Sequence, residues 1–251
     1  MIGQFDVDAA IVDLDGTLVD TLDDFVLALN RMLADLPLPY QDQQVDRATV
    51  ARLLGKGSEN LIKSVLSLAI QAQTATDKVA LLSSCAAWPE AELDAAALEP
   101  LFDQAWPSYQ HHYQAVNGQH ATVYPGVEAA LAYLKAQGLK LACLTNKPTA
   151  FAQALLKAKR LAHFFQFIFG GDAFERKKPD PLPLLKTCAA LGTVPGRTLM
   201  IGDSSNDAQA ARAAGCPVLL VSYGYNHGLP VRAVDADAFT DSLQSLIPDP
   251  V

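Results

Sequence analysis

Two aspartates separated by one residue, Asp13 and Asp15, stand at the end of a short apolar run near the start of the chain. The run, residues 9–14, has the composition of a buried strand, and Gly16 directly follows the pair. Where a strand leads into a loop, side chains two residues apart point the same way. The two carboxylates are therefore expected to face one point, where they can bind a cation or act in nucleophilic and acid–base chemistry.

Polar clusters also follow three later apolar runs of the chain. They are Thr145-Asn146-Lys147, Lys177-Lys178-Pro179, and Asp203 with Asp207. If the strands are parallel, all of these clusters meet at one edge of the sheet. Carboxylates around one point favour a hard divalent cation such as Mg2+, while hydroxyl, amide and lysine groups donate to phosphate oxygens. The pattern predicts a site for Mg2+ and a phosphate group.

The segments that position these clusters alternate between strands and helices from residue 123 onward. Strand-like runs occupy residues 9–14, 139–144, 167–169, 198–201 and 217–221, and helix-like segments occupy residues 127–137, 150–161, 183–191 and 206–214. The strands read as continuous apolar runs, which is typical of a parallel sheet with helices on both faces. This pattern predicts an α/β fold with a doubly wound, Rossmann-like parallel sheet.

Residues 22–117 read differently, because no strand-like run occurs among them. Helical spacing rich in Ala, Leu and Gln extends over residues 22–36, 58–70 and 93–116. A helical block inserted after the first strand lies above the carboxyl ends of the strands, where it can act as a lid. We predict two domains: an α/β core of residues 1–21 and 118–251, and an all-helical cap of residues 22–117.

The bulk composition limits the classes of function. The 27 acidic residues outnumber the 19 Lys and Arg for a net charge of -8, which argues against a nucleic-acid-binding protein. The four cysteines are scattered, so neither a disulfide framework nor a zinc site is predicted. No apolar run approaches the roughly 20 residues of a membrane span. We expect a cytoplasmic protein, monomeric or homodimeric, that acts on a small phosphorylated metabolite and binds neither nucleic acid nor membrane.

The order of the motifs resembles a known family. Asp13-Leu14-Asp15-Gly16-Thr17, then Thr145, Lys178 and Gly202-Asp203-Ser204-Ser205-Asn206-Asp207, is similar to the haloacid dehalogenase superfamily of phosphohydrolases. The resemblance covers essentially the whole chain. Within the superfamily, bacterial phosphoglycolate phosphatases are the most similar group, on residues 123–127, 145–148, 170–172, 178–181 and 223–228.

This resemblance implies a role for each matched residue. Asp13 would attack phosphorus to form an aspartyl-phosphate, and Asp15 would protonate the leaving group and then activate water. The implied Mg2+ ligands are a carboxylate oxygen of Asp13, the main-chain carbonyl of Asp15 and the carboxylate of Asp203. Asp207 would orient the metal's waters or Lys178. The implied phosphate-binding groups are those of Thr145, Asn146 and Lys178.

The implied function is Mg2+-dependent hydrolysis of a small phosphomonoester, with 2-phosphoglycolate as the first candidate and glycolate and phosphate as products. The alternatives are a phosphatase of a phosphosugar or amino-sugar acid phosphate, a β-phosphoglucomutase-like enzyme, and a non-catalytic phosphate-binding scaffold. The cap would select the leaving group. Its stretch Leu54-Gly55-Lys56-Gly57-Ser58 matches a specificity loop of the family in which asparagine is usual. We hypothesise that Lys56 binds the glycolate carboxylate, although this departure from the family pattern equally fits another substrate.

Overall fold

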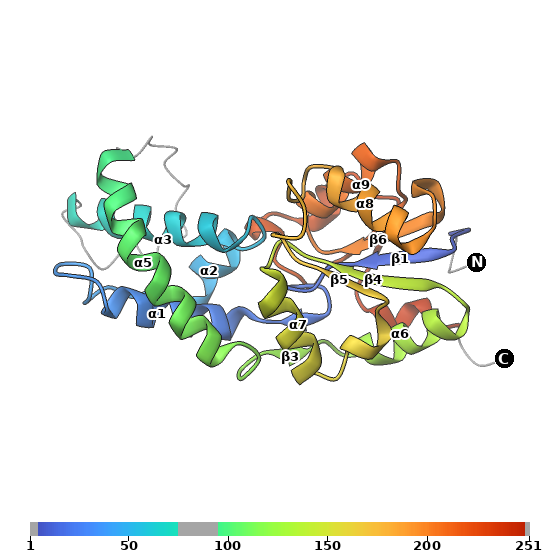
Figure 1. Cartoon of the computed structure of the whole chain (residues 1–251), viewed down its shortest axis with the longest axis horizontal. Helices are drawn as coiled ribbons and strands as arrows, with labels where there is room; N and C mark the ends of the chain where they lie inside the picture. The colour runs from blue at the N-terminus through green and yellow to red at the C-terminus, as the bar shows by residue number, and fades with distance from the viewer. Residues whose placement is uncertain (1–4, 75–94, 249–251) are drawn as a thin grey trace.

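A parallel sheet forms the centre of the computed structural model, which describes residues 5–74 and 95–248 (Figure 1). Its strands are β1 (Ala9–Val12), β4 (Lys140–Leu144), β5 (Phe167–Phe169), β6 (Thr198–Gly202), β7 (Val218–Val221) and β8 (Ala238–Thr240). Within the described residues they form one six-stranded sheet, ordered β5-β4-β1-β6-β7-β8, with every neighbouring pair parallel. The predicted doubly wound α/β fold is confirmed.

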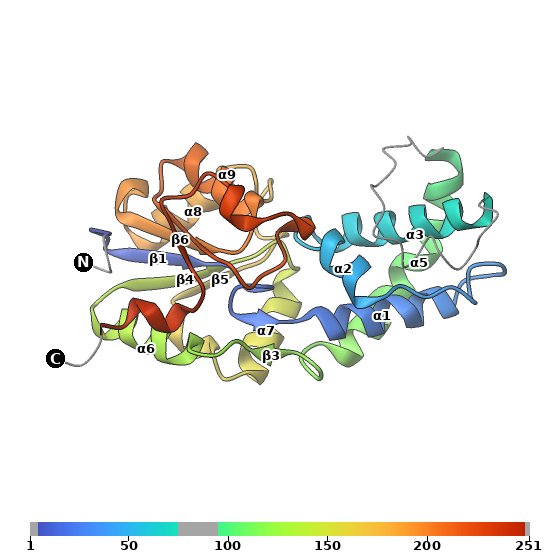
Figure 2. The same ribbon diagram turned by 180° about the vertical axis from the view of Figure 1, so that it is seen from behind.

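Helices cover both faces of this sheet (Figures 1 and 2). They are α6 (Val127–Ala136), α7 (Thr149–Ala158), α8 (Leu182–Leu191) and α9 (Ser205–Ala214). In β1, Ala10 and Val12 belong to the hydrophobic core under α6 and α7, whereas Ala9 and Ile11 belong to the core under α8 and α9. Because side chains on both faces are buried, the strand needs apolar residues at every position.

Short 3-10 helices connect several of these elements, at Ala162–Phe164, Pro195–Arg197, Asn226–Gly228, Val231–Ala233 and Leu243–Leu246. Across the two described ranges, no helix combines the length and the apolar character that crossing a membrane requires.

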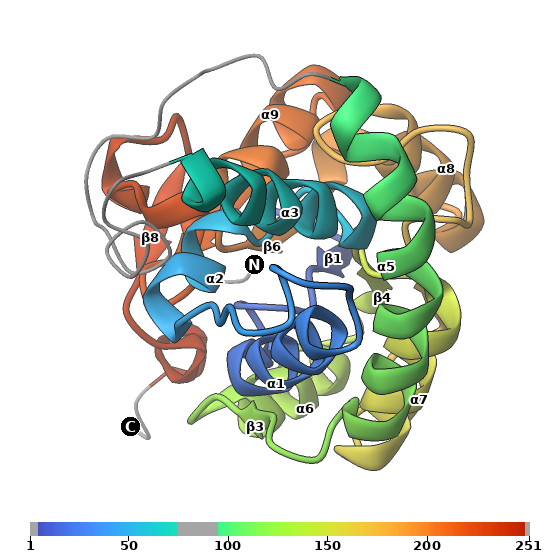
Figure 3. The same cartoon turned by 90° about the vertical axis from the view of Figure 1, so that its left-hand side faces the viewer.

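A separate group of helices lies over the carboxyl ends of the strands (Figures 1 and 3). They are α1 (Leu22–Ala34), α2 (Arg47–Leu53), α3 (Ser58–Thr74) and α5 (Ala95–Val116). They share a hydrophobic core of their own, in which the Phe25 ring of α1 stacks on the Tyr113 ring of α5 with centroids 5.0 Å apart. We propose on this basis that residues 22–117 form the predicted cap. Residues 93 and 94 of the predicted third cap helix lie outside the described residues.

The two chain segments that join core and cap pair with each other. β2 (Val19–Asp20) and β3 (Thr122–Val123) form an antiparallel ribbon, with Val19 opposite Val123. Beside the ribbon, the fully buried Asp24 accepts hydrogen bonds from the backbone N–H groups of Gly118, at 2.6 Å, and His120, at 2.8 Å. Asp24 therefore holds the first turn of α1 against the segment that returns to the core.

Replacing Asp24 with Ala is expected to destabilise this junction. The change leaves two backbone N–H groups without their charged acceptor and should lower the free energy of unfolding by about 2–4 kcal/mol. Urea denaturation followed by circular dichroism measures the loss. The neighbouring Asp23, which is exposed and pairs with Arg47, provides the control: Asp23→Ala should cost less than about 1 kcal/mol. Equal losses in the two variants would contradict the role given to Asp24.

Candidate active site

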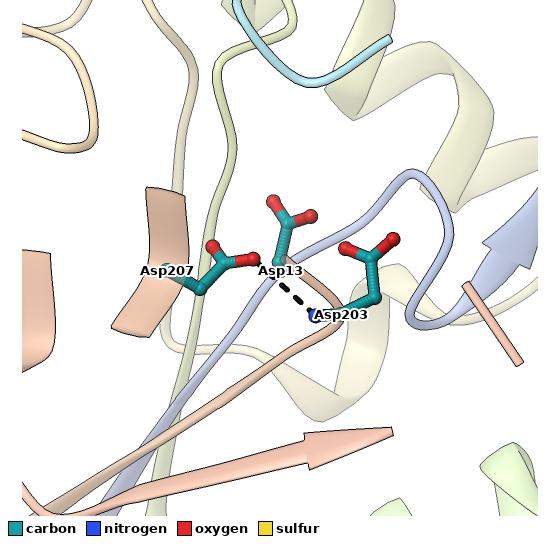
Figure 4. A group of neighbouring side chains, drawn as sticks. All are labelled: Asp13, Asp203 and Asp207. Atoms are coloured by element: carbon teal, nitrogen blue, oxygen red, sulfur yellow. Dashed lines mark hydrogen bonds between the residues drawn. The ribbon is translucent and has the colours of Figure 1, made fainter. Parts of the chain in front are cut away.

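Three carboxylates meet above the carboxyl ends of the two central strands. Asp13 follows β1, Asp203 follows β6, and Asp207 lies in the first turn of α9 (Figure 4). All three residues are buried, and one oxygen from each lies within 4.8 Å of the others. Since β1 and β6 are neighbours in the sheet, the loops that leave them end at the same place. The structure thus brings together three of the acids singled out from the sequence.

The electrostatics of this cluster fit a bound cation. Burial raises the pKa of Asp13 to about 7, although the nearby Lys178 opposes the rise. Burial also raises the pKa of Asp203 well above its ordinary value, and the adjacent Asp207 and Asp13 add to the effect. Carboxylates that are out of water and close to one another favour a positive charge between them. Oxygen donors of this kind are those that Mg2+ prefers.

Lys178 is the positive charge that the chain itself supplies to the cluster. Its ammonium donates to Asp13 Oδ1 at 2.7 Å, to Asp207 Oδ1 at 2.6 Å and to the carbonyl oxygen of Leu144 at 2.8 Å. These contacts use all three of its N–H donors. The charges of Asp13 and Asp207 raise the pKa of Lys178 despite its burial, so it remains charged.

Asp207 also orders the loop that carries Asp203. Its Oδ2 accepts hydrogen bonds from the Ser204 hydroxyl at 2.7 Å and from the backbone N–H of Ser204 at 3.2 Å and of Asp203 at 3.3 Å. The Ser204 side chain in turn accepts a hydrogen bond from the backbone N–H of Asp207, the third residue of α9, and this reciprocal pair makes a capping box at the start of the helix. Asp207 therefore helps to start the helix and also holds Lys178.

Gly16 is required by the close approach of Asp203. Its φ is +85°, and a Cβ there would lie 2.2 Å from Asp203 Oδ2. The same carboxylate oxygen accepts a hydrogen bond from the backbone N–H of Tyr225 at 2.7 Å. A side chain at position 16 would therefore displace the Asp203 carboxylate from its place in the cluster.

Asp15 is held by residues that the motif comparison did not assign. Its Oδ1 accepts hydrogen bonds from the Thr21 hydroxyl at 2.7 Å and from the Lys147 ammonium at 2.9 Å. Its Oδ2 has no hydrogen-bond partner in the described part of the chain. Asp15 is one of the residues that line the pocket. Lys147 stands in the Thr145-Asn146-Lys147 cluster, so its position was visible in the sequence, but its contact with Asp15 was not.

The two other residues of that cluster differ in how their side chains are used. Thr145 is buried and lines the pocket. Asn146 donates from its amide to the carbonyl oxygens of Gly55 and Lys178, both at 2.9 Å, and accepts from the Lys178 N–H at 3.0 Å. The Asn146 amide thus joins the core to the cap loop in this structure, and its predicted contact with phosphate stays a prediction.

Lys56 is exposed in the turn between α2 and α3, and it is not among the residues that line the pocket. It lies near His227, whose pKa is lowered by burial and by the charge of Lys56. The neighbouring Gly55 is in contact with the pocket and with His227, where a Cβ would lie 2.7 Å from the ring. The hypothesis that Lys56 binds the leaving group stays a prediction.

Comparison with known proteins decides the family. The sequence model of the haloacid dehalogenase-like hydrolase family matches residues 10–221. The chain belongs to this family. The match begins within β1 and ends with β7, so it includes β1 and β6, the strands that position the acidic cluster of this haloacid dehalogenase-like hydrolase. The resemblance noted in the sequence is confirmed.

Individual relatives of this haloacid dehalogenase-like hydrolase match nearly its full length. It is 40% identical to a phosphoglycolate phosphatase of Thiobacillus denitrificans, over 94% of this chain and 92% of the relative. It is 41% identical to the plasmid-encoded phosphoglycolate phosphatase of Cupriavidus necator, over 95% of this chain and 90% of the relative. The crystal structure of a predicted phosphoglycolate phosphatase from Haemophilus somnus superposes with a TM-score of 0.82 at 31% identity, covering 97% of this chain and 98% of that one.

Gly16→Ala tests whether the Asp203 carboxylate must occupy its observed place. Gly138 offers a matched control, because its φ of +84° is within 1° of that of Gly16 but nothing lies within 4 Å of its Cβ position. Both substitutions impose a left-handed backbone on alanine, at about 1–2 kcal/mol. Only Gly16→Ala should reduce phosphatase kcat/KM, by about 100-fold or more, measured with 4-nitrophenyl phosphate. Similar activities in the two variants would show that the Asp203 position does not matter.

Mg2+ is expected to stabilise the protein, and more so at pH 8 than at pH 6. The ion competes with protons for Asp13, whose pKa is about 7, and for Asp203. Mg2+ at 100 times its Kd adds about 2.7 kcal/mol, which raises Tm by roughly 5–10 °C for a chain of this size. Differential scanning fluorimetry with and without MgCl2 measures the shift.

The control is Tm measured in EDTA, because the raised pKa of Asp13 by itself makes Tm depend on pH. Without Mg2+, the raised pKa of Asp13 contributes stability that is complete below its unfolded value near pH 4 and lost as pH rises through about 7. Tm in EDTA should therefore fall from pH 6 to pH 8. Asp203→Asn should abolish the Mg2+ shift, whereas Asp103→Asn, at an exposed position on α5, should keep it. A shift that is equal at both pH values would contradict metal binding by these carboxylates.

Proposed function

We propose that this chain is a Mg2+-dependent phosphatase that hydrolyses 2-phosphoglycolate to glycolate and phosphate through an aspartyl-phosphate. The observation that carries the proposal is the Asp13 carboxylate, which is held by Lys178, belongs to the buried acidic cluster and lines the same pocket as Asp15. The names of relatives that match over more than nine-tenths of the chain support the substrate.

Asp13 is the proposed nucleophile. Lys178 donates to its Oδ1, while its Oδ2 has no hydrogen-bond partner within the described ranges and is free to attack phosphorus. A new bond forms between this oxygen and phosphorus as the bond from phosphorus to the leaving oxygen breaks. The contact with Lys178 fixes the rotamer of Asp13, so the attacking oxygen keeps one direction.

Asp15 is the proposed acid and base. It donates its proton to the departing glycolate oxygen, and it then accepts a proton from the water that attacks the aspartyl-phosphate. Thr21 and Lys147 both donate to its Oδ1, which leaves Oδ2 to carry the transferred proton toward the pocket. The second displacement releases phosphate and returns Asp13 to its starting form.

The remaining groups offset the negative charge of the phosphate. The Thr145 hydroxyl is proposed to donate to a phosphoryl oxygen, and the charge of Lys178 lies beside the reacting centre. Mg2+, when bound by Asp13, Asp203 and the carbonyl of Asp15, would supply the positive charge that lets an anionic nucleophile approach an anionic phosphate. Asp207 is proposed to keep Lys178 in place rather than to touch the substrate.

A substrate panel tests this assignment. The values of kcat/KM for 2-phosphoglycolate, several phosphosugars, a nucleoside monophosphate and pyrophosphate are compared in the presence of MgCl2. We expect 2-phosphoglycolate to exceed each of the others by about tenfold or more. Asp13→Asn should reduce the activity on every substrate by about 1000-fold or more, because an amide oxygen is a poor nucleophile.

The assignment of the substrate and the assignment of the nucleophile can each be contradicted without the other. A phosphosugar that reacts faster than 2-phosphoglycolate would replace the substrate and leave the chemistry in place. Retained activity in a folded Asp13→Asn protein would remove Asp13 as nucleophile. Trapping of phosphate on the wild-type chain, found by mass spectrometry after a rapid acid quench and absent in the variant, would support the intermediate directly.

A further inference from the structure

Lys147 is a buried cation in the pocket that the proposed chemistry does not fully use. It follows β4, and its side chain is only 1% exposed. Among the described residues that line the pocket, the basic ones are Lys147 and Lys178. Lys178 already donates to three acceptors beside Asp13, so it has no donor to spare for a leaving group.

The surroundings of Lys147 leave it one donor. Its ammonium donates to Asp15 Oδ1 at 2.9 Å and makes a short contact with the Tyr113 hydroxyl. No third acceptor is present in the described part of the chain, although an ammonium carries three N–H groups. Burying a charged donor without a partner is costly, so this position favours an acceptor from outside the chain.

Aromatic rings from the cap enclose the same ammonium. It lies 4.5 Å from the centroid of the Phe25 ring and 4.7 Å from that of the Tyr113 ring. Phe25 comes from α1 and Tyr113 from α5, whereas Lys147 belongs to the core. The rings stabilise the charge and keep water away, which strengthens any further ionic contact that the ammonium makes.

We propose that Lys147 is the residue that selects the leaving group, by binding the carboxylate of a short 2-hydroxy acid next to Asp15. This inference rests on the proposed function and assigns the recognition of glycolate to a core lysine. The ligand class is an anionic group on the carbon adjacent to the oxygen that leaves phosphorus.

The contact with Asp15 limits how long the leaving group can be. The leaving oxygen and the Lys147 ammonium both contact the Asp15 carboxylate, which places them within about two hydrogen-bond lengths plus the width of the carboxylate, roughly 8 Å. A carboxylate on the adjacent carbon has its oxygens about 3–4 Å from the leaving oxygen and reaches the ammonium through one hydrogen bond, within this limit. An acid longer by two or more carbons would have to fold back, so the site favours a short acid.

Lys56 is the competing candidate for the same contact. It is exposed and lies outside the pocket lining, whereas Lys147 is inside the pocket and already contacts Asp15. The two assignments make different predictions, since only the residue that binds the carboxylate should affect 2-phosphoglycolate more than a substrate without a carboxylate.

The test compares three substrates in Lys147→Met, Lys56→Ala and Lys157→Met. Ethyl phosphate has the two carbons of 2-phosphoglycolate but no carboxylate, and 4-nitrophenyl phosphate has a leaving group that departs without protonation. Lys157 is exposed on α7, so Lys157→Met is the matched control and should leave all three activities unchanged. The deciding quantity is the ratio of kcat/KM for 2-phosphoglycolate to that for ethyl phosphate, because effects on Asp15 cancel in it.

We expect Lys147→Met to lower this ratio by about 100-fold, as for removal of one partner of a buried charge pair, and to lower activity on 4-nitrophenyl phosphate less than activity on 2-phosphoglycolate. An unchanged ratio, even with both activities reduced, would overturn the proposal and leave Lys147 as a residue that only positions Asp15. A selective fall of the ratio in Lys56→Ala alone would overturn it in favour of Lys56.

If Lys147→Met does not fold, a second variant and a fourth substrate test the same contact. Lys147→Gln keeps a hydrogen-bond donor to Asp15 without a charge and should lower the same ratio. In the wild type, 2-aminoethyl phosphate should react at least tenfold more slowly than ethyl phosphate, because its cation faces the ammonium, and an equal rate would overturn the proposal. A wild-type ratio near one would instead show that the proposed substrate is wrong.

Discussion

The arrangement of the site depends on one buried ammonium between two buried carboxylates. Lys178 joins Asp13 to Asp207, and through Asp207 the loop that carries Asp203 is also fixed. Removing a single partner from such a set leaves a charge in a medium of low polarity, which costs far more than the pair contributes. The Asp13 carboxylate, the loop that carries Asp203 and the first turn of α9 therefore form one electrostatic unit, and the sheet supplies the rigid support on which its members are placed.

A second set of contacts joins this unit to the cap. Asp15 is bonded to Thr21, at the foot of α1, and to Lys147, whose ammonium lies against rings from α1 and α5. The Asn146 amide bonds the cap loop at Gly55. Asp15, the proposed acid and base, thus lies where core and cap touch.

The sheet and the acidic cluster could be predicted because their signals are local. Continuous apolar runs mark strands that are buried on both faces. Asp13, Asp15, Asp203 and Asp207 stand just after two such runs, so parallel strands bring them to the same edge of the sheet. The elements that were not predicted, α2, β2, β3, β8 and the 3-10 helices, are short, and the three strands among them depend on partners distant in sequence. The contacts of Lys147 could not be read from the chain either, because Tyr113 and Phe25 reach it only once the cap has folded.

The β2–β3 ribbon has a consequence for how such a protein can change. The chain enters and leaves the cap through two strands that lie side by side, so the ends of the insertion are separated by only about 5 Å. Any module whose own ends are that close can be inserted at this point without moving β1 or β6. The loops that follow β1, β4 and β6 can therefore keep their places while the helices that cover them are replaced, and only the rings around Lys147 would change with the insertion.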